Sequence, residues 1–362
     1  MVRDAVTRRR FLEGAGATAL AAGAAFPAWA SAPRSMRYVD SLCTLPDDLS
    51  ELGHARLSAM ICDVSNGQGI YNGDGTPDYF RTYDANIDRT VARLTGSAEG
   101  FVALRGSDVG ARPGCAVFMQ FQTCVPIGTD LSRLAYFHGK GLRVLQFTHS
   151  SDDLFAGSWL QRVQTGLTPL GMDGLAEMNR LRIVPDVAHG SVPTMLDVAR
   201  RSATPIILSH GAARAIVDHP RCAPDEVIRA LADTGGTMGI FMLSFWLTRD
   251  PVPTIDHLLA QIRHVAKVGG IDSVGIANDF SIAGASNIGE LLEGYQSWWT
   301  RMHEAGTPGF QVPPRHVVIP ELNRIDRMER IHAALESDGF RQEEIDKIMG
   351  LNWTRVLTDV LG

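Results

Sequence analysis

The chain has 362 residues, with 34 Lys and Arg against 40 Asp and Glu and a formal net charge of −6. A pI near 6.0 leaves no basic field that could hold a phosphate backbone, so we exclude nucleic acid as an expected partner. Hydrophobic residues make up 45% and charged residues 20%, which is typical of a globular chain with a large core and excludes a disordered or fibrous one.

The first thirty residues have the pattern of an export signal. A twin-arginine sequence at Thr7–Leu12 is followed by a short, weakly apolar stretch from Ala15 to Ala28 and by the small-residue cleavage site Ala28-Trp29-Ala30. The apolar stretch is too short and too rich in Gly for a stable membrane anchor, which needs about 20 strongly apolar residues. We therefore expect residues 1–30 to be cleaved, the protein to be periplasmic or exported, and residues 31–362 to form a single domain.

Short β-rich apolar runs alternate with stretches of helical periodicity along the rest of the chain. Strands that are continuously apolar need a parallel sheet buried on both faces, and eight of them predict an α/β fold of the (β/α)₈ TIM-barrel type, with its chemistry at the carboxyl ends of the strands. The expected strands are Tyr38–Cys43, Ser58–Val64, Ala116–Phe121, Leu142–Phe147, Arg182–Val187, Pro205–Ser209, Thr237–Leu243 and Ser273–Ala277. The expected helices include Asn86–Leu94, Leu170–Leu181, Thr194–Arg201, Pro224–Thr234 and Ile255–Val268.

Polar residues collect where three of these strands end. His189 follows the fifth strand, His210 the sixth and Asp279 the eighth. Neutral imidazoles and a carboxylate suit Zn²⁺ or a similar divalent ion, and a barrel mouth holds them on rigid supports with a position open for water. These residues predict a metal site. The alternative is that both histidines hydrogen-bond to their surroundings and hold no metal.

These motifs resemble the membrane dipeptidases of the renal dipeptidase type, which belong to the zinc-dependent amidohydrolase-like barrels. The resemblance covers about Tyr38 to Val356 and is most specific over residues 166–221 and 274–280. The motifs that carry it are Gly166–Gly171, Glu177–Leu181, Asp186–His189, Ser209–Arg214, Asp218–Arg221, Val274–Phe280 and Gly350–Val356.

The resemblance implies a site with two zinc ions bridged by a Glu carboxylate and a water or hydroxide. It assigns His189 and His210 to one metal, and Asp279 to the other metal and to proton transfer. It also implies that His149 faces the scissile carbonyl of a small peptide and that Arg221 grips the free carboxylate. A metal-bound water loses a proton near pH 7, and a guanidinium matches a carboxylate with a planar fork, so the physical chemistry agrees with these roles. A homodimer is a further expectation of the resemblance.

The first half of the chain departs from the family pattern. Where the family has a D-x-H-x-D run, this chain has Asp40-Ser41-Leu42-Cys43-Thr44, so the two ligand positions fall on Leu42 and Thr44. The position of the bridging Glu falls on Gln122, whose neutral amide would be only a weak contact. Because Asp279 is then the one anionic ligand left, we predict at most one metal ion, most simply Zn²⁺.

Three hypotheses about function follow. The preferred one is an exported metallohydrolase that cleaves the amide of a dipeptide or a related small acylated amino acid, with Asp279 as the base and His149 as the oxyanion donor. The second is a catalytically inactive barrel that binds a peptide or amino acid through Arg221 and His149. The third is a site with two histidines and one carboxylate for Fe(II) or another redox metal.

Five cysteines remain after the predicted cleavage, without the C-x-x-C spacing of a thiolate zinc site or a redox pair. Burial as small apolar residues is the simplest interpretation, although an oxidising compartment permits disulfides and the odd number leaves at least one free thiol. Cys43 and Cys124 lie beside the replaced ligand positions, where they could recruit a soft metal or form a disulfide. The five are Cys43, Cys62, Cys115, Cys124 and Cys222.

Overall fold

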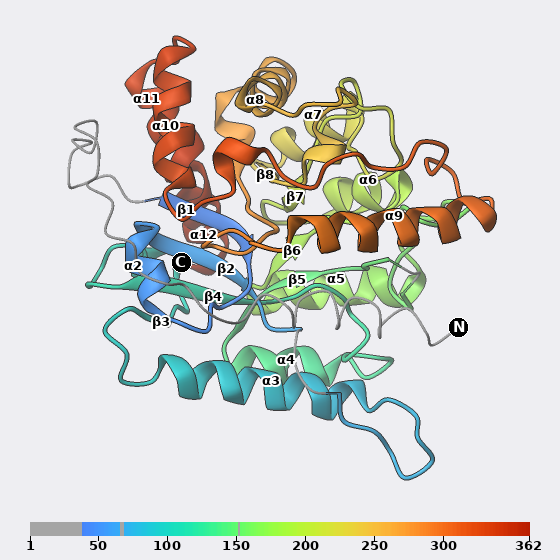
Figure 1. Ribbon diagram of the computed structural model, residues 1–362. Coiled ribbons are helices and arrows are strands. Elements are labelled where there is room, and N and C mark those ends of the chain that lie inside the picture. The colour runs from blue at the N-terminus through green and yellow to red at the C-terminus, as the bar shows by residue number, and fades with distance from the viewer. Residues whose placement is uncertain (1–37, 66–68, 151–152) are drawn as a thin grey trace.

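The computed structural model describes residues 38–65, 69–150 and 153–362, so the predicted export signal lies outside the described residues. Parallel strands form a nearly closed barrel with helices around it (Figure 1). All eight predicted strands are confirmed, in the order β1-β2-β4-β5-β6-β7-β8-β9; a further short strand, β3, pairs with β4. The strands are β1 (Tyr38–Cys43), β2 (Leu57–Asp63), β3 (Gly100–Val102), β4 (Cys115–Phe121), β5 (Leu142–Gln146), β6 (Val184–Asp186), β7 (Ile207–Gly211), β8 (Thr237–Ile240) and β9 (Val274–Ile276).

The last strand returns to the first. Just beyond β9, the backbone N–H of Asp279 donates to the carbonyl of Leu42 at 2.8 Å. Inside the barrel the hydroxyl of Ser41 lies 2.6 Å from the carbonyl oxygen of Ser209 and 3.1 Å from that of Ile276. These contacts bring the carboxyl ends of β1, β7 and β9 to the same rim.

Several helices begin where their sequences provide side-chain caps. Thr168 and Ser191 each accept a hydrogen bond from the backbone N–H three residues on, and a proline lies in the first turn that follows. The first predicted helix starts earlier than expected, at Tyr79, because the side chain of Asp78 caps it. The helices are α2 (Ser50–His54), α3 (Tyr79–Leu94), α4 (Ser132–Gly139), α5 (Pro169–Leu181), α6 (Val192–Arg201), α7 (Asp225–Asp233), α8 (Ile255–Gly269), α9 (Ile288–Glu304), α10 (Arg327–Ser337), α11 (Gln342–Asp346) and α12 (Asn352–Leu361).

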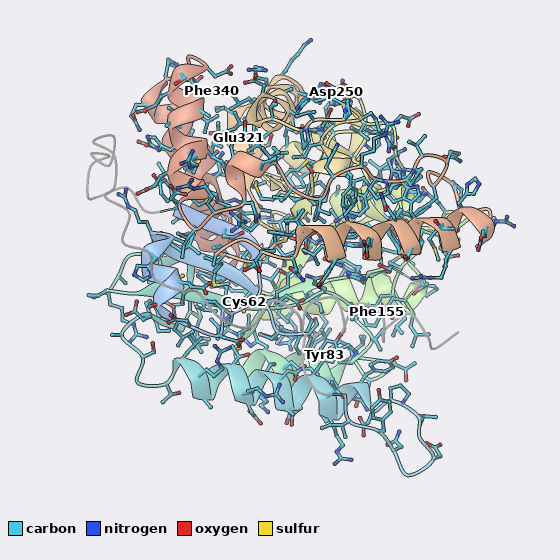
Figure 2. The ribbon with its side chains drawn as sticks, viewed as in Figure 1. Cys62, Tyr83, Phe155, Asp250, Glu321 and Phe340 are labelled. Carbon is cyan, nitrogen blue, oxygen red and sulfur yellow. The ribbon has the colours of Figure 1, made fainter. Side chains whose placement is uncertain are left out.

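Apolar side chains fill the space between the strands and the outer helices. Tyr83 of α3 lies between its helix and the sheet in Figure 2, and its ring meets that of Phe121 on β4 edge-on, with centroids 4.8 Å apart. The neighbouring α3 and α4 also touch through Phe80 and Phe137. Across the described ranges, no helix combines the length and the apolar character that crossing a membrane requires.

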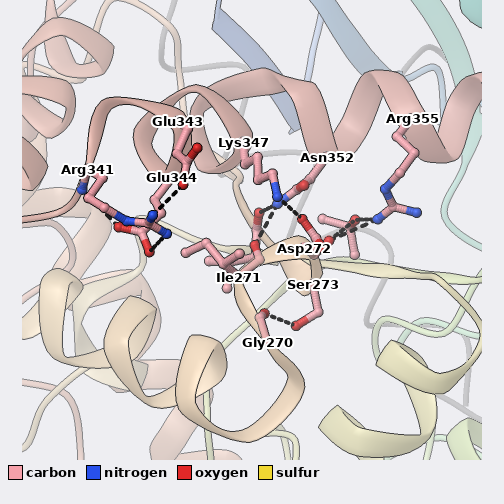
Figure 3. Close-up of polar contacts among 12 residues, drawn as sticks. Gly270, Ile271, Asp272, Ser273, Arg341, Glu343, Glu344, Lys347, Asn352 and Arg355 are labelled. Carbon is pink, nitrogen blue, oxygen red and sulfur yellow. Dashed lines mark hydrogen bonds and ion pairs between the residues drawn. The ribbon is translucent and has the colours of Figure 1, made fainter.

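The C-terminal helix α12 closes the amino end of the barrel. Trp353 is fully buried there among apolar residues from the first halves of the strands. Figure 3 shows how polar contacts hold this segment: the side chain of Asn352 donates to the carbonyls of Ile271 and Val274 at 2.8 Å, and Arg355 donates to the carbonyl of Asp272 at 2.9 Å. The opposite, carboxyl end of the barrel is therefore the end left for chemistry.

Packing at the closed end leads to a test of the fold. A Cβ added to Gly275 on β9 would lie 2.1 Å from Nε1 of Trp353. Because a well-packed core resists added volume, we expect Gly275→Ala to lower the free energy of unfolding by about 1–3 kcal/mol. Denaturant unfolding measures the loss. Gly73→Ala, where a new Cβ meets nothing within 4 Å, is the control; equal stabilities of the two variants would contradict the proposed closure by α12.

Candidate active site

The rim at the carboxyl ends of the strands carries every candidate residue of the sequence analysis. His149 follows β5, His189 follows β6 and His210 lies within β7, while Asp279 follows β9. Two of them have a left-handed backbone, with φ of 62° at His189 and 46° at Asp279. Such conformations cost energy in residues with a side chain and concentrate at functional sites.

Three imidazoles meet at this rim. The Nε2 atoms of His189 and His210 are 2.8 Å apart, and the ring of His149 stacks on that of His189 with centroids 4.1 Å apart. His210 is fully buried and His189 is 6% exposed, whereas His149 is partly open to solvent. The structure thus brings together the three histidines that the sequence analysis selected.

The buried carboxylate of Asp186 is connected to this cluster by hydrogen bonds. Its carboxylate accepts hydrogen bonds from the backbone N–H and hydroxyl of Ser209, the N–H of Ala188 and the amide of Gln120. Burial raises the pKa of the Asp186 carboxyl, and the hydrogen bonds from Ser209 lower it in part. The Ser209 hydroxyl also lies 2.9 Å from Nδ1 of His210, so the carboxylate holds that ring through one serine.

Arg221 lies directly beside the histidines. It is 1% exposed, and its Nη2 donates to the backbone carbonyl of His210 at 3.1 Å. Its guanidinium lies 5.4 Å from the ring centroid of Phe241 and 5.6 Å from that of Trp246, distances at which a cation and an aromatic face attract. A permanent positive charge is therefore held in an aromatic environment at the site.

His219 supports the loop that carries Arg221. Its Nδ1 accepts the backbone N–H of Arg221 at 3.0 Å. Burial, reinforced by nearby arginines, lowers the pKa of His219 to about 3, so this ring is neutral near pH 7. The aromatic residues whose rings approach it are Trp159, Trp246, Trp299 and Phe310.

A second polar network fixes the residue before Asp279. Asp40 accepts the backbone N–H and the side-chain amide of Asn278 at 2.8 and 2.6 Å, and Arg327 donates to the amide oxygen of Asn278 at 3.1 Å. Burial raises the pKa of Asp40 to about 7 against these hydrogen bonds. The network ties β1 to the end of β9 and thereby sets the place of Asp279.

The three positions to which the resemblance assigns further ligands lie at the same rim. Leu42 is buried on β1, Thr44 follows that strand and Gln122 is buried just beyond β4. The two cysteines beside them form no disulfide: the thiol of Cys43 contacts the carbonyl of Phe280, and all five cysteines are free and buried. Burial raises the pKa of these thiols, to about 12 at Cys62, which makes them poor sources of thiolate.

Two parts of the site escaped the sequence analysis. The indole N–H of Trp159 donates to Nδ1 of His189 at 3.3 Å, and Ser209 links His210 to Asp186. Ser209 directly precedes the candidate ligand His210, so its position in the sequence could have indicated a role at the site. Trp159 lies in a loop thirty residues before its partner, and no sequence pattern relates the two.

Solved structures identify the class of protein. An amidohydrolase from Pseudomonas aeruginosa superposes with a TM-score of 0.76, covering 90% of this chain and 97% of that one at 23% identity. A metallopeptidase from Rhodobacter sphaeroides, solved with a phosphinate mimic of the dipeptide L-Ala-D-Ala, gives 0.71 over 90% and 99% at 18% identity. The fold is that of the metallo-dependent hydrolase barrels.

Sequence comparison then shows the family. The model of the membrane dipeptidases, peptidase family M19, matches residues 107–296, just over half of the chain. The chain belongs to this family, as its motifs indicated. Dipeptidase tcpJ of Claviceps purpurea is 31% identical over 252 residues, and dipeptidase verJ of Clonostachys rogersoniana is 34% identical over 146. The alignment with tcpJ covers 68% of this chain and 51% of that protein, and the alignment with verJ covers 39% and 36%. The chain therefore spans about half or less of the length of these relatives.

The family and its metallopeptidase structures imply a divalent metal, typically zinc, but the donor set of this chain does not fit the family's centre. Leu42 has no donor atom, and Thr44 and Gln122 offer only neutral oxygens where carboxylates would balance the charge of two dications. Over the described ranges, no three His, Cys, Asp or Glu side chains are grouped so as to hold an ion. The assignment of His189, His210 and Asp279 to a single zinc or Fe(II) ion stays a prediction from the sequence.

The low pKa of His219 makes stability depend on pH. In the unfolded chain this histidine is protonated below about pH 6.5, but in the folded chain only near pH 3. As the pH falls between these two values, the free energy of unfolding therefore decreases, by up to about 1.4 kcal/mol per pH unit. We expect His219→Asn, whose amide oxygen can still accept the N–H of Arg221, to flatten the acid decline of the unfolding free energy. Urea unfolding at several pH values measures the slope. His303→Asn on α9 is the control, and parallel pH profiles for wild type and His219→Asn would contradict a buried neutral ring.

Proposed function

We propose that this chain binds a dipeptide or a related small acylated amino acid at the carboxyl end of its barrel, without the pair of metal ions of its family. In this proposal Arg221 pairs with the free carboxylate of the ligand, and His149, the partly exposed imidazole, faces the amide. One observation carries the proposal: a buried guanidinium lies beside the stacked rings of Phe241 and Trp246, directly against the backbone of His210.

The chemistry of that guanidinium favours a carboxylate. Arginine is always charged, and its planar fork can form two parallel hydrogen bonds to a carboxylate, which a lysine cannot do. In an environment of low dielectric constant such an ion pair is stronger than in water. The dipeptidases among the relatives and the dipeptide mimic in the R. sphaeroides structure make a small peptide the natural ligand to test.

A second candidate is hydrolysis of the same ligand with a single divalent ion, the function preferred from the sequence. It is favoured by one observation, the convergence of Nε2 of His189 and Nε2 of His210 on one point at the rim. The two candidates share the ligand and differ in whether the purified protein carries metal and turns the peptide over.

Ligand binding can be tested with a panel of L,L and L,D dipeptides. We expect at least one dipeptide to raise the melting temperature of the wild type, and its carboxyl-amidated form to have no effect, because the amide removes the charge that Arg221 binds. In Arg221→Gln the affinity should fall about 10-fold or more, since a hydrogen bond to a charged group contributes about 1.5–3 kcal/mol. Calorimetric titration measures the affinity.

The controls separate the two candidates. Arg229→Gln removes an exposed arginine on α7 and should bind like the wild type. Turnover of the dipeptides with about one bound ion per chain by elemental analysis would establish the second candidate instead. Equal binding of free and amidated dipeptides, or no binding by any of them, would contradict the role given to Arg221.

We also propose export by the twin-arginine route, on the basis of Arg8 and Arg9 and the cleavage site that ends at Ala30. In a bacterial host with this pathway, the full chain should be recovered from the periplasm with Ser31 as its first residue. Replacing both arginines by lysine should retain the uncleaved chain in the cytoplasm. Cell fractionation with N-terminal sequencing measures the outcome, and unchanged export of the double variant would refute the proposal.

A further inference from the structure

We infer that in this chain a proton, and not a metal ion, joins His189 to His210: His189 carries its proton on Nε2 and donates it to the bare Nε2 of His210. The two atoms are 2.8 Å apart, a hydrogen-bond distance. The inference concerns the rim of the barrel alone and does not depend on the ligand proposed for Arg221. It stands on two independent lines of hydrogen bonds that reach the pair from opposite sides.

The first line starts at Trp159. An indole N–H can only donate, and this one lies 3.3 Å from Nδ1 of His189, so that Nδ1 is the acceptor and carries no proton. A neutral imidazole has one proton, which must then be on Nε2 of His189. That nitrogen faces His210.

The second line starts at Asp186. Every group that contacts its carboxylate is a donor, including the hydroxyl of Ser209 at 2.6 Å. A hydroxyl has one hydrogen, and since Ser209 gives it to Asp186, its oxygen accepts from Nδ1 of His210 at 2.9 Å. His210 therefore carries its proton on Nδ1, and its Nε2 is bare. Both lines place a single proton between the two rings, on the side of His189.

This arrangement suits a metal at only one of the two rings. A histidine ligand binds metal through a bare nitrogen and donates its other N–H to an acceptor behind it. His210 meets this requirement through Ser209 and Asp186. His189 is reversed, because its bare nitrogen faces Trp159 and its N–H points toward the place where an ion would lie.

Moving the proton of His189 to Nδ1 would place two N–H groups against each other. Trp159 is only 2% exposed, and its ring stacks on that of Phe310 with centroids 5.9 Å apart, so packing opposes a rotation of the indole. A wrong partner behind a histidine ligand lowers metal affinity about 10-fold to 100-fold. The neutral amide of Gln122, at the position where the family resemblance places a bridging Glu, adds a further loss.

The closed pair has a structural role of its own. It connects the loop that carries Trp159 to β6 and β7, and the carbonyl of His210 accepts the hydrogen bond from Arg221 at 3.1 Å. The backbone of His210 thereby connects the histidine pair to the guanidinium of Arg221.

The position of the proton can be observed directly in the full chain. Long-range ¹H–¹⁵N correlation spectra of protein labelled with ¹⁵N-histidine distinguish protonated from bare ring nitrogens, and His189→Gln and His210→Gln assign the two rings. In metal-free wild type we expect a bare Nδ1 with a protonated Nε2 for His189, and the opposite for His210. A protonated Nδ1 on His189 would overturn the inference.

Zinc affinity provides a second readout. Titrated with ZnCl₂ in the presence of a competing chelator, Trp159→Phe should bind zinc at least about 10-fold more tightly than wild type, because its ring no longer holds the proton of His189 on Nε2. Adding Gln122→Glu should increase the affinity again, and His210→Gln should abolish the gain. Trp298→Phe, which removes the indole whose ring meets that of Trp159 edge-on, is the matched control.

The zinc titrations test the position of the proton separately from ligand binding by Arg221. Tight, stoichiometric zinc binding by the wild type, unchanged in Trp159→Phe, would overturn the inference while leaving carboxylate binding by Arg221 untouched. Conversely, failure of dipeptides to bind would not alter the ring spectra or the order of the zinc affinities.

Discussion

The buried carboxylate of Asp186 is the interaction on which the rim of this barrel depends. A carboxylate removed from water must be fully hydrogen-bonded, and here every contact with it comes from a donor on β4, β6 or β7 or just beyond it. Because those donors are committed to the carboxylate, the hydroxyl of Ser209 and then the ring of His210 have their hydrogens set by it. Asp186 therefore sets the proton of His210, while Trp159 sets that of His189.

The hydrogen-bond network of Asp186 extends through His210 to Arg221. The backbone carbonyl of His210 accepts a hydrogen bond from its guanidinium, and the rings of Phe241 and Trp246 lie beside the charge, so the cation is held in place before any ligand arrives. A preorganised charge in an environment of low dielectric constant favours a small anionic group that can replace water completely. In the function we propose, this barrel of the dipeptidase family binds a carboxylate through Arg221 without the two metal ions of its family.

Much of the fold followed from the periodicity of the sequence. Eight apolar runs and the capped helices between them became strands and helices close to their predicted bounds, because a parallel barrel leaves its strands no solvent-exposed face and so no alternation. Strand β3 escaped prediction because three residues are too few to show a period. The meeting of His189 and His210 also followed, since the strands that precede or carry them end at one rim, whereas His149 was selected from the family resemblance.

The sequence by itself determined the family and the barrel, because these depend on residue identity at a known spacing; the replacement of ligands at Leu42, Thr44 and Gln122 stays a prediction from the same spacing. Only the tertiary structure decided which atoms face each other. Trp159 and His189 meet through a loop whose course no local pattern encodes, and the direction of one indole N–H distinguishes a histidine ready for metal from one that is not. Hydrogen-bond direction is a property of three-dimensional neighbours, and so the chemistry of the pair could not be read from the chain alone.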